Sequence, residues 1–450
     1  MKLTYNVQDK PKFGQVIVFA IQQLLAILAA TIAVPAIIGN GMSQSAALFG
    51  AGVGTLVYLA FTKFKSPVFL GSSFAFIGSM FAAFGGGASM ALGYVGLILG
   101  AIFAGLVYVI IAIIVKFCGV KWINKIMPPV VIGPTVAIIG LSLAGNAVKD
   151  AVGCSAGFIE YDAANSVYLM NWKGLIALVC ALITLAVVMI CSVYGKKMTK
   201  MIPFIIGIGA GYAAAAIFTV IGIATKNEVL QIINFSLFKE MQWVPDFTFL
   251  KAFSGLKEVT GKYIISILVA YVPVAFVVFA EHIADHKNLS SIIEHELLED
   301  PGLHRTLLGD GVGSMVGALF GGCPNTTYGE SVGCVAISGN ASVVTILATA
   351  VLAIIAAFVA PFTTFLATIP SCVMGGVCIS LYGFIAVSGL KMLQPVDLGD
   401  NRNLFTASVI LITGIGGMAL SIKGIKLTAI ACALILGILT NYILNRKKEN

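Results

Sequence analysis

The stretch Cys323-Pro324-Asn325-Thr326-Thr327-Tyr328-Gly329-Glu330-Ser331-Val332-Gly333 lies between two long apolar runs, yet it is polar, contains glycine and carries a carboxylate. Non-helical polar sequence at membrane depth is tolerated only where it is buried in protein or lines a water-filled cavity, because hydrocarbon offers no hydrogen-bond partners. We therefore predict that this stretch forms half of a solute-binding site.

The composition of the chain indicates a polytopic membrane protein. Of its 450 residues, 59% are hydrophobic and only 10% are charged, and the mean hydropathy is +1.01, which leaves too little polar surface to cover a soluble globule. The run from Gly14 to Gly39 is long enough to span a bilayer and more runs follow at once, so we expect it to be the first helix and not a cleaved signal.

The distribution of charge argues against a nucleic-acid partner. The net charge of +8 comes from Lys and Arg residues that are spread over short connections between apolar runs and are not gathered in one patch. Most of these connections fall on the same side if the N-terminus is cytoplasmic, as the positive-inside rule requires. We therefore predict that both termini are cytoplasmic.

The apolar runs predict an all-α protein with about fourteen transmembrane segments. Runs of roughly 17 to 25 residues are the length that a spanning helix needs. Two of them, 67–83 and 324–339, are short and carry Gly with Ser or Thr, so we expect both to be broken segments. The predicted segments are 14–39, 44–62, 67–83, 90–116, 128–147, 173–193, 201–224, 262–284, 303–321, 324–339, 342–368, 371–390, 404–421 and 426–444.

A short repeated motif indicates two inverted repeats of seven segments. Pro128 to Gly133 and Pro370 to Gly375 share the pattern Pro-x-x-Val-x-Gly, and they begin the fifth and twelfth segments. The two broken segments, the third and the tenth, are also seven apart. An odd number of segments per repeat inverts the second copy. Chance recurrence in a chain rich in Gly and Val is the alternative for the motif alone.

The two broken segments can form one binding site. If Phe69 to Phe76 and Asn325 to Glu330 are each an extended piece followed by a half-helix, the antiparallel pieces can pair near the midplane. The backbone N–H groups of two helix N-termini then face one pocket, which suits the carbonyl oxygens of a neutral polar solute. For 71–76 the alternative is a small-residue patch for helix packing.

Two carboxylates at membrane depth are the strongest chemical signal. Glu281 ends the apolar run of the eighth segment and Glu330 begins the second broken one. A charge at mid-bilayer is penalised by about 2.5 to 3.5 kcal/mol, so neither is expected without a function. Carboxylates accept N–H bonds, and with backbone N–H groups they complement a ring of alternating N–H and C=O, which describes a nucleobase. Tyr328 and Phe74 are candidate flat walls, with ordinary packing as the alternative.

Other polar residues are weaker candidates. Asp285 follows Glu281 at i+4 and shares its helical face, although Asp285 and His286 could instead belong to a solvated helix end. Asp310 lies within the ninth segment and is a candidate brace for the broken segments. The sequence contains no Walker A motif, nucleophile elbow or convincing metal spacing. We expect no ATP-driven transport, no enzymatic activity, no metal and no cofactor.

These residues resemble the nucleobase–ascorbate transporter family, also called nucleobase:cation symporter-2, and within it the bacterial uracil transporters. The resemblance covers essentially the whole chain. It is carried by Gln22 to Pro35, Phe69 to Phe76, Ala280-Glu281-His282, Asp300 to Arg305 and Asn325 to Glu330.

The resemblance implies a core domain from residues 14–116 and 262–368 and a gate domain from residues 128–224 and 371–444. It also implies proton-coupled transport across a bacterial inner membrane by a homodimer, with Glu281 and Glu330 contacting a pyrimidine and coupling the proton. The backbone around Phe74 and Gly329 would bind the carbonyl oxygens of the ligand. The candidate binding residues are Glu281, Glu330, Phe74, Gly329, Tyr328, Ser73 and Asp285, and Asp310, Gln22 and Thr327 are expected behind them.

The chain departs from the family pattern at several positions. Gln23 stands where the uracil transporters usually have His, and Asp285 and Asp310 are residues of purine-transporting relatives. Within and after the signature, Ser331, Ser338 and Gly339 replace its Asn, Thr and basic residue. Glu330 favours uracil over xanthine, whereas the other departures favour xanthine or a broader range.

The sequence therefore predicts a proton-coupled nucleobase importer, with uracil as the first choice of substrate. An anion transporter or channel of similar inverted-repeat fold is the alternative of another substrate class, and two acids without a buried cation in the broken segments argue against it. An intramembrane enzyme would need a nucleophile and base pair at membrane depth, which the sequence lacks.

Overall fold

The computed structural model describes residues 3–119, 122, 127–196, 198–422 and 425–445. Within these residues, eight helices are long and apolar enough to cross a membrane, and nine if a pair bent by 82° counts as one span. Each of the fourteen predicted segments contains helix, and the shorter ones are broken or begin with a strand. The prediction of an all-α polytopic membrane protein is confirmed.

The first half of the chain holds seven of the segments. Several helices begin at a capping residue whose side chain accepts a backbone N–H of the first turn. Examples are Ser43, Ser89 and Asn171. The elements are α1 (Phe13–Ile38), α2 (Gln44–Phe61), β1 (Leu70–Ser72), η1 (Phe74–Phe76), α3 (Ile77–Gly86), α4 (Met90–Cys118), α6 (Pro129–Ser142), α7 (Ala144–Ala151), β2 (Glu160–Asp162), β3 (Val167–Leu169), α8 (Trp172–Tyr194), α9 (Met198–Met201) and α10 (Pro203–Ala224).

The second half repeats this order after a connection of short helical turns. Its elements are η2 (Glu228–Leu230), η3 (Phe235–Lys239), α11 (Thr248–Ala252), η4 (Phe253–Glu258), α12 (Gly261–Ile293), η5 (Leu298–Gly302), α13 (Leu303–Gly321), β4 (Asn325–Thr327), α14 (Gly329–Ser338), α15 (Val343–Ala357), α16 (Ala360–Thr368), α17 (Ser371–Lys391), α18 (Asn401–Ile415), β5 (Leu420–Ile422), β6 (Ile425–Leu427) and α19 (Ala429–Asn445).

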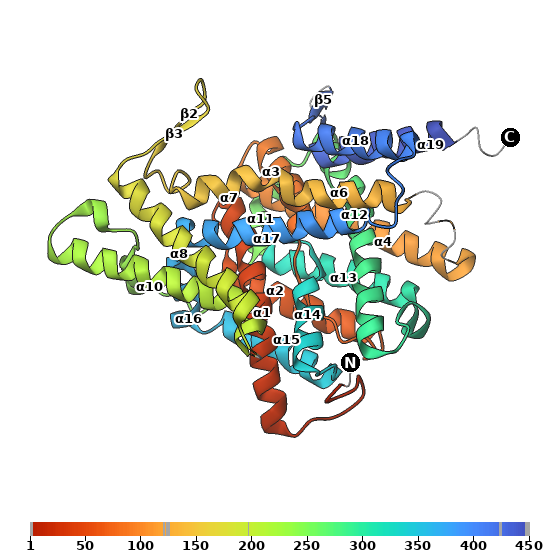
Figure 1. The fold of residues 1–450 in the computed structure, drawn as a ribbon, viewed down its shortest axis with the longest axis horizontal. Coiled ribbons are helices and arrows are strands. Elements are labelled where there is room, and N and C mark those ends of the chain that lie inside the picture. The colour runs from red at the N-terminus through yellow and green to blue at the C-terminus, as the bar shows by residue number, and fades with distance from the viewer. Residues whose placement is uncertain (1–2, 120–121, 123–126, 197, 423–424, 446–450) are drawn as a thin grey trace.

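The contacts between helices show the two-fold repeat. Contacts of α1 with α15 and of α2 with α15 match those of α12 with α4 and of α13 with α4. Likewise, α8 contacts α10 and α17, as α18 contacts α19 and α6. Figure 1 shows α6, α17, α18 and α19 in the upper part of the view and α1, α2, α14 and α15 in the lower part. Each helix thus finds its counterpart seven segments later.

The two broken segments pair as predicted. β1 and β4 run antiparallel, with Gly71 opposite Thr326, and both strands are fully buried. Each strand leads into a short half-helix, through η1 into α3 and directly into α14. All three residues of each strand are buried, so the ladder bonds satisfy backbone groups that apolar surroundings would leave without partners. Residues 71–76, for which a small-residue packing patch was the alternative, form the end of strand β1 and the helical turn η1.

Two predicted segments have the wrong ends. The segment predicted at 404–421 is helical only to Ile415, and residues 420–422 form a strand that pairs with 425–427. Gly416 and Gly417 follow the helix, and Gly417 has a φ of +69°, which glycine adopts without strain. The segment predicted at 262–284 continues as α12 to Ile293, because its polar last turns pack inside the protein.

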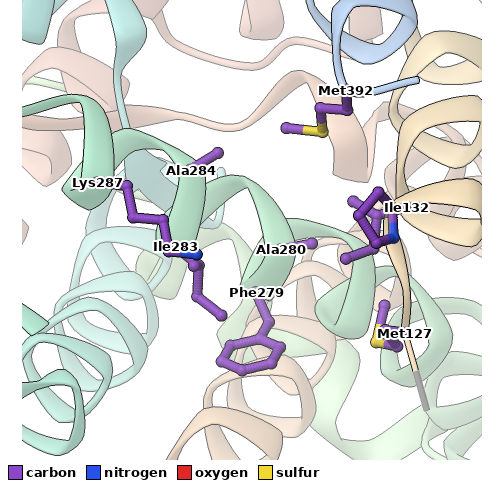
Figure 2. A pocket seen from close by; sticks show the side chains of 9 residues that line it. Met127, Ile132, Phe279, Ala280, Ile283, Ala284, Lys287 and Met392 are labelled. Carbon is purple, nitrogen blue, oxygen red and sulfur yellow. The ribbon is translucent and has the colours of Figure 1, made fainter. Parts of the chain in front are cut away.

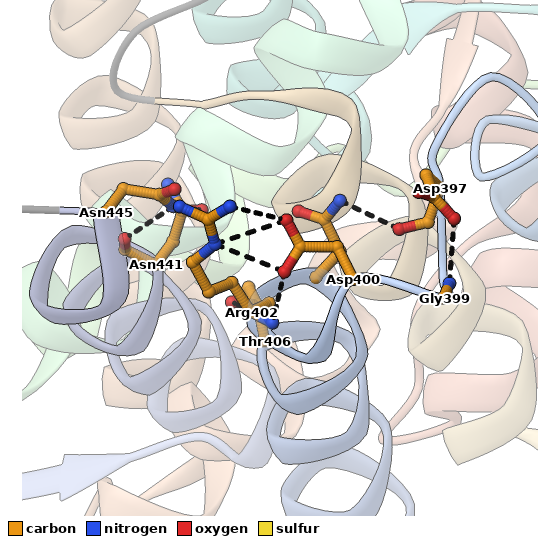
Figure 3. A network of polar contacts seen from close by, with 8 residues as sticks. Asp397, Gly399, Asp400, Arg402, Thr406, Asn441 and Asn445 are labelled. Carbon is orange, nitrogen blue, oxygen red and sulfur yellow. Dashed lines mark hydrogen bonds and ion pairs between the residues drawn. The ribbon is translucent and has the colours of Figure 1, made fainter. Parts of the chain in front are cut away.

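A polar network fixes the start of α18. The Asp400 side chain accepts the backbone N–H of Arg402, and the Arg402 guanidinium forks onto the same carboxylate, 2.8 Å away at the nearest pair of atoms (Figure 3). The Asn403 side-chain amide donates to the carbonyl of Asp397. Together these contacts end the preceding turn and begin the helix.

Candidate functional site

The centre of the site is the crossing of the two broken segments. The Tyr328 hydroxyl donates to the carbonyl of Ser72 at 2.8 Å, and the Ser73 N–H donates to the carbonyl of Pro324. A Cβ on Gly71 would lie 2.2 Å from the Tyr328 ring, so the ring covers the strand only because residue 71 has no side chain. The tyrosine therefore stabilises the crossing.

A cavity of about 360 Å³ opens beside the second half-helix. One wall is polar and carries Glu281 and Asp285 from α12 with Gly329 and Glu330 from α14. The opposite wall comes from α6, α10 and α17 and is apolar, with Val136, Phe204, Leu381, Phe384 and Ile385. A flat ligand with a polar edge fits such a cavity, because one side offers hydrogen-bond acceptors and the other offers apolar contact.

Asp285 lies in this cavity and not at a solvated helix end. The Thr327 hydroxyl donates to its carboxylate at 2.8 Å, which fixes the side chain against β4. A Cβ on Gly329 would find the Asp285 carboxylate as its nearest neighbour, at 3.8 Å. His286 is fully buried, so the alternative of a solvated end is wrong for both residues. The cause is the continuation of α12 beyond the predicted end.

Gln23, which departs from the family pattern, links the two repeats. Its amide donates to the Ser331 hydroxyl at 2.6 Å, and the same hydroxyl accepts the backbone N–H of Phe69 at 3.2 Å. Gln23 and Ser331, two of the departures, therefore form one buried contact. Gln22 is also buried, and its side-chain oxygen has no hydrogen-bond partner among the described residues.

Several predicted binding side chains lie away from the cavity. Ser73 and Tyr328 are buried in the crossing. Phe74 lines a different, mainly apolar cavity of about 190 Å³ beside α3, where its ring meets Tyr382 edge to face. Asp310 pairs with His282, the residue after Glu281, inside the bundle, and its role as a brace for the broken segments stays a prediction. The structure thus gathers Glu281, Glu330, Asp285, Gly329 and Thr327.

The sequence did not reveal the wall opposite the carboxylates. Its Phe204 and Phe384 belong to ordinary apolar runs, so nothing in their spacing distinguishes them from residues that face lipid. Lys200 on α9 also lines the cavity. From the sequence it was one of the basic residues in short connections that set the orientation of the chain in the membrane. Only the packing of distant helices brings these residues together.

A second cavity of about 230 Å³ adjoins the first (Figure 2). It lies between α12 and the ends of α6 and α17, and it shares Ala284 and Met392 with the larger cavity. Its walls are apolar except for Lys287. It therefore offers space beside the polar site without further acceptors.

The described residues contain no group of three or more His, Cys, Asp or Glu side chains placed to hold a metal ion.

A polar cavity at the end of a half-helix, within a membrane-spanning bundle built from two inverted repeats, is typical of transporters. Residues 14–423 match the family model Xan_ur_permease, described as the Permease family. The chain belongs to this family, nucleobase:cation symporter-2, and is a multi-pass membrane permease and not an enzyme.

Named relatives agree with this assignment. The chain is 40% identical to the uracil permease of Bacillus caldolyticus over 98% of this chain and 95% of that protein. It is 37% identical to the uracil permease of Bacillus subtilis over 100% and 97% of the two chains. Its fold is similar to the transmembrane domain of the cyanobacterial bicarbonate transporter BicA, with a TM-score of 0.63 at 15% identity over 98% and 99% of the two chains.

Proposed function

We propose that this protein imports a nucleobase, uracil in the first place, together with protons. The observation that carries the proposal is the cavity in which Glu281, Asp285 and Glu330 face an apolar wall. Uracil presents two N–H donors and two carbonyl acceptors at the edge of a flat ring. Carboxylates accept the N–H groups, the N–H groups of the first turn of α14 have no carbonyl partner within their own helix, and the apolar wall covers the ring.

The names of the relatives support a nucleobase as the ligand, since the two Bacillus relatives compared above are uracil permeases. The bicarbonate transporter shares the fold alone, and its likeness gives no support to anion transport here. The described residues that line the cavity include three carboxylates and one cationic side chain, Lys200. This excess of negative charge disfavours an anionic solute. Asp285 in the cavity favours xanthine or a broader range as the second candidate, because it adds an acceptor for a further N–H group.

The proposed transport cycle is a movement of two groups of helices about the cavity. α1, α2, α4, α12, α13 and α15 make extensive contacts among themselves, as do α6, α8, α10, α17, α18 and α19. We assign the first group to the core domain and the second to the gate domain, each with the residue limits given above. Alternating access then moves the apolar gate wall relative to the polar core wall. A homodimer in a bacterial inner membrane, with both termini cytoplasmic, completes the proposal.

The test is uptake of labelled uracil into proteoliposomes with and without an imposed pH gradient. We expect concentrative uptake that a proton ionophore abolishes. Unlabelled thymine, xanthine and 5-substituted uracils are then added as competitors. Competition by xanthine as strong as that by uracil would favour the broader range. Flux of bicarbonate without uptake of uracil would contradict the proposal.

A further inference from the structure

The second cavity, of about 230 Å³, lies outside the space in which we place uracil. It adjoins the larger cavity, and Ala284 of α12 and Met392 at the end of α17 line both. Its other walls are apolar except for Lys287, which is exposed. Figure 2 shows Ile132 and Met127 on one side of this space and Lys287 on the other. A group attached to a ligand in the larger cavity can therefore extend into the second one past Ala284 and Met392.

The chemistry of the pyrimidine ring decides which of its edges can face this space. Uracil carries its two N–H donors and its two carbonyl acceptors on the consecutive ring positions N1 to C4. The remaining edge, from C5 to C6, carries only C–H groups. A buried N–H or C=O group needs a hydrogen-bond partner, so these groups face the polar wall of Glu281, Asp285 and Glu330. The C5–C6 edge is left for the apolar side, where Met392 lies.

The walls of the second cavity suit an apolar substituent. Met127 and Phe279 are buried there, and Ile132 is partly buried against the same hydrophobic core. On α12 the space is bordered by Ala280 and Ala284, which are four residues apart and share one face of the helix. Their small side chains leave room beside the helix. A methylene group that moves from water onto such a surface gains about fourfold in affinity.

We propose that the second cavity is a subsite for an apolar substituent on carbon 5 or carbon 6 of a pyrimidine. The inference rests on the proposed nucleobase function and deepens it, because it defines which ligands the same site accepts. Uracils that carry an alkyl chain on this edge bind more tightly than uracil itself. An alkyl chain on N1 has the opposite effect, since it removes an N–H group that a carboxylate of the polar wall would accept.

The test is competition of 5-alkyl and 6-alkyl uracils, from methyl to butyl, with labelled uracil for binding to the purified full-length protein. In at least one of the two series, we expect the affinity to rise by up to about fourfold for each added methylene until the subsite is full. The 1-alkyl uracils of the same chain lengths are the control ligands. They have the same apolar area and partition equally into detergent, but we expect them to bind more weakly than uracil.

Ile132→Phe tests where the alkyl chain lies. Ile132 lines the second cavity and not the larger one, so a bulkier side chain narrows the subsite alone. We expect unchanged affinity for uracil and no rise of affinity with chain length. Ile132→Ala widens the subsite and should move the optimum to a longer chain. Ile190→Phe on α8 is the matched control, because Ile190 is 55% exposed and lines neither cavity. It should leave both series unchanged.

The outcomes separate the two proposals. If affinity rises along neither series, or rises equally in Ile132→Phe and in the unmodified protein, the subsite is overturned and the nucleobase function stands. If Ile132→Phe does not fold, Ile132→Ala decides, and an unchanged optimal chain length overturns the subsite. A lack of uracil binding to the unmodified protein would overturn the proposed function and this inference together.

Discussion

The two broken segments have the same architecture and different chemistry. Each places a buried strand before a half-helix, and the strands pair with each other. The half-helix α14 faces a cavity with three carboxylates, whereas α3 faces a smaller cavity lined mainly by apolar side chains such as Ile77 and Phe81. The repeat therefore supplies the fold twice, while the buried carboxylates that line a cavity are concentrated in the second copy.

The largest expected effect is the loss of a cavity carboxylate. Glu281→Gln or Glu330→Gln replaces an ionised acceptor with a weaker one, and removal of one partner of a buried charged hydrogen bond costs roughly 2 to 5 kcal/mol. We expect uracil affinity to fall by about 30-fold or more, with a matching loss of uptake. Equilibrium binding to the purified protein measures the effect. Glu160→Gln in the exposed strand β2 is the control, and equal affinity in all three variants would remove the distinction between the segments.

A smaller effect is expected at the crossing of the strands. In Gly71→Ala the new methyl group meets the ring of Tyr328, which cannot retract while its hydroxyl is bonded to Ser72. Overpacking of this kind costs roughly 1 to 3 kcal/mol. Gly78→Ala in α3 is the matched control, because nothing lies within 4 Å of its added Cβ. Thermal unfolding in detergent should show a lower Tm for the first variant alone; equal Tm values would contradict the close packing at Gly71.

The link between the repeats should have a further, more modest effect. Ser331→Ala leaves the Gln23 amide and the Phe69 N–H without the acceptor that they share, at a cost of about 1 to 2 kcal/mol. Ser142→Ala removes only a bond from a hydroxyl to its own helix, so it should change stability less. The comparison of their Tm values checks this, and an equal loss would show that the link contributes nothing beyond a local bond.

The smallest effect belongs to an ion pair outside both broken segments. Lys65 Nζ lies 2.7 Å from the Asp300 carboxylate, and the hydrogen bond from Lys65 lowers the pKa of Asp300. Because the folded pKa is below the ordinary value of about 3.9, the pair stabilises the fold above that pH and loses this effect as the pH falls through the lower folded pKa. Exposed pairs contribute about 0 to 1 kcal/mol. The Tm of Asp300→Asn should approach that of the unmodified protein below pH 4, and a Tm difference that widens there would contradict the sign.

The features that the sequence predicted are those marked by polar residues within apolar runs. Two short segments with Gly and Thr identified the paired strands, and Glu281 and Glu330 identified the polar wall. The sequence did not predict which residues share a cavity across the repeats. Phe74 was expected beside the ligand and lies in the apolar cavity, while Phe204, Phe384 and Lys200 complete the polar one. Apolar periodicity does not distinguish a helix face that lines a cavity from one that faces lipid.

The end of α12 was misplaced for a related reason. The residues from His282 to Asp285 are polar enough to end a membrane segment on hydropathy alone. In the structure they face protein: His282 is held by Asp310 and Asp285 by Thr327. Partners that are distant in sequence satisfy these groups, and neither partner is visible from local composition.

The most direct test of the central claim compares the two cavities for occupancy. Gly333 lines the carboxylate cavity and Gly78 the apolar one, and nothing lies within 4 Å of a Cβ added at either position. Gly333→Cys, combined with Cys334→Ala because the native thiol lines the same cavity, and Gly78→Cys are each labelled with a small maleimide, and mass spectrometry that locates the label on the new cysteine gives the rate. We predict that uracil slows labelling at position 333 and leaves position 78 unchanged. Protection at position 78 alone, or equal protection at both, would contradict the assignment of ligand recognition to the second repeat.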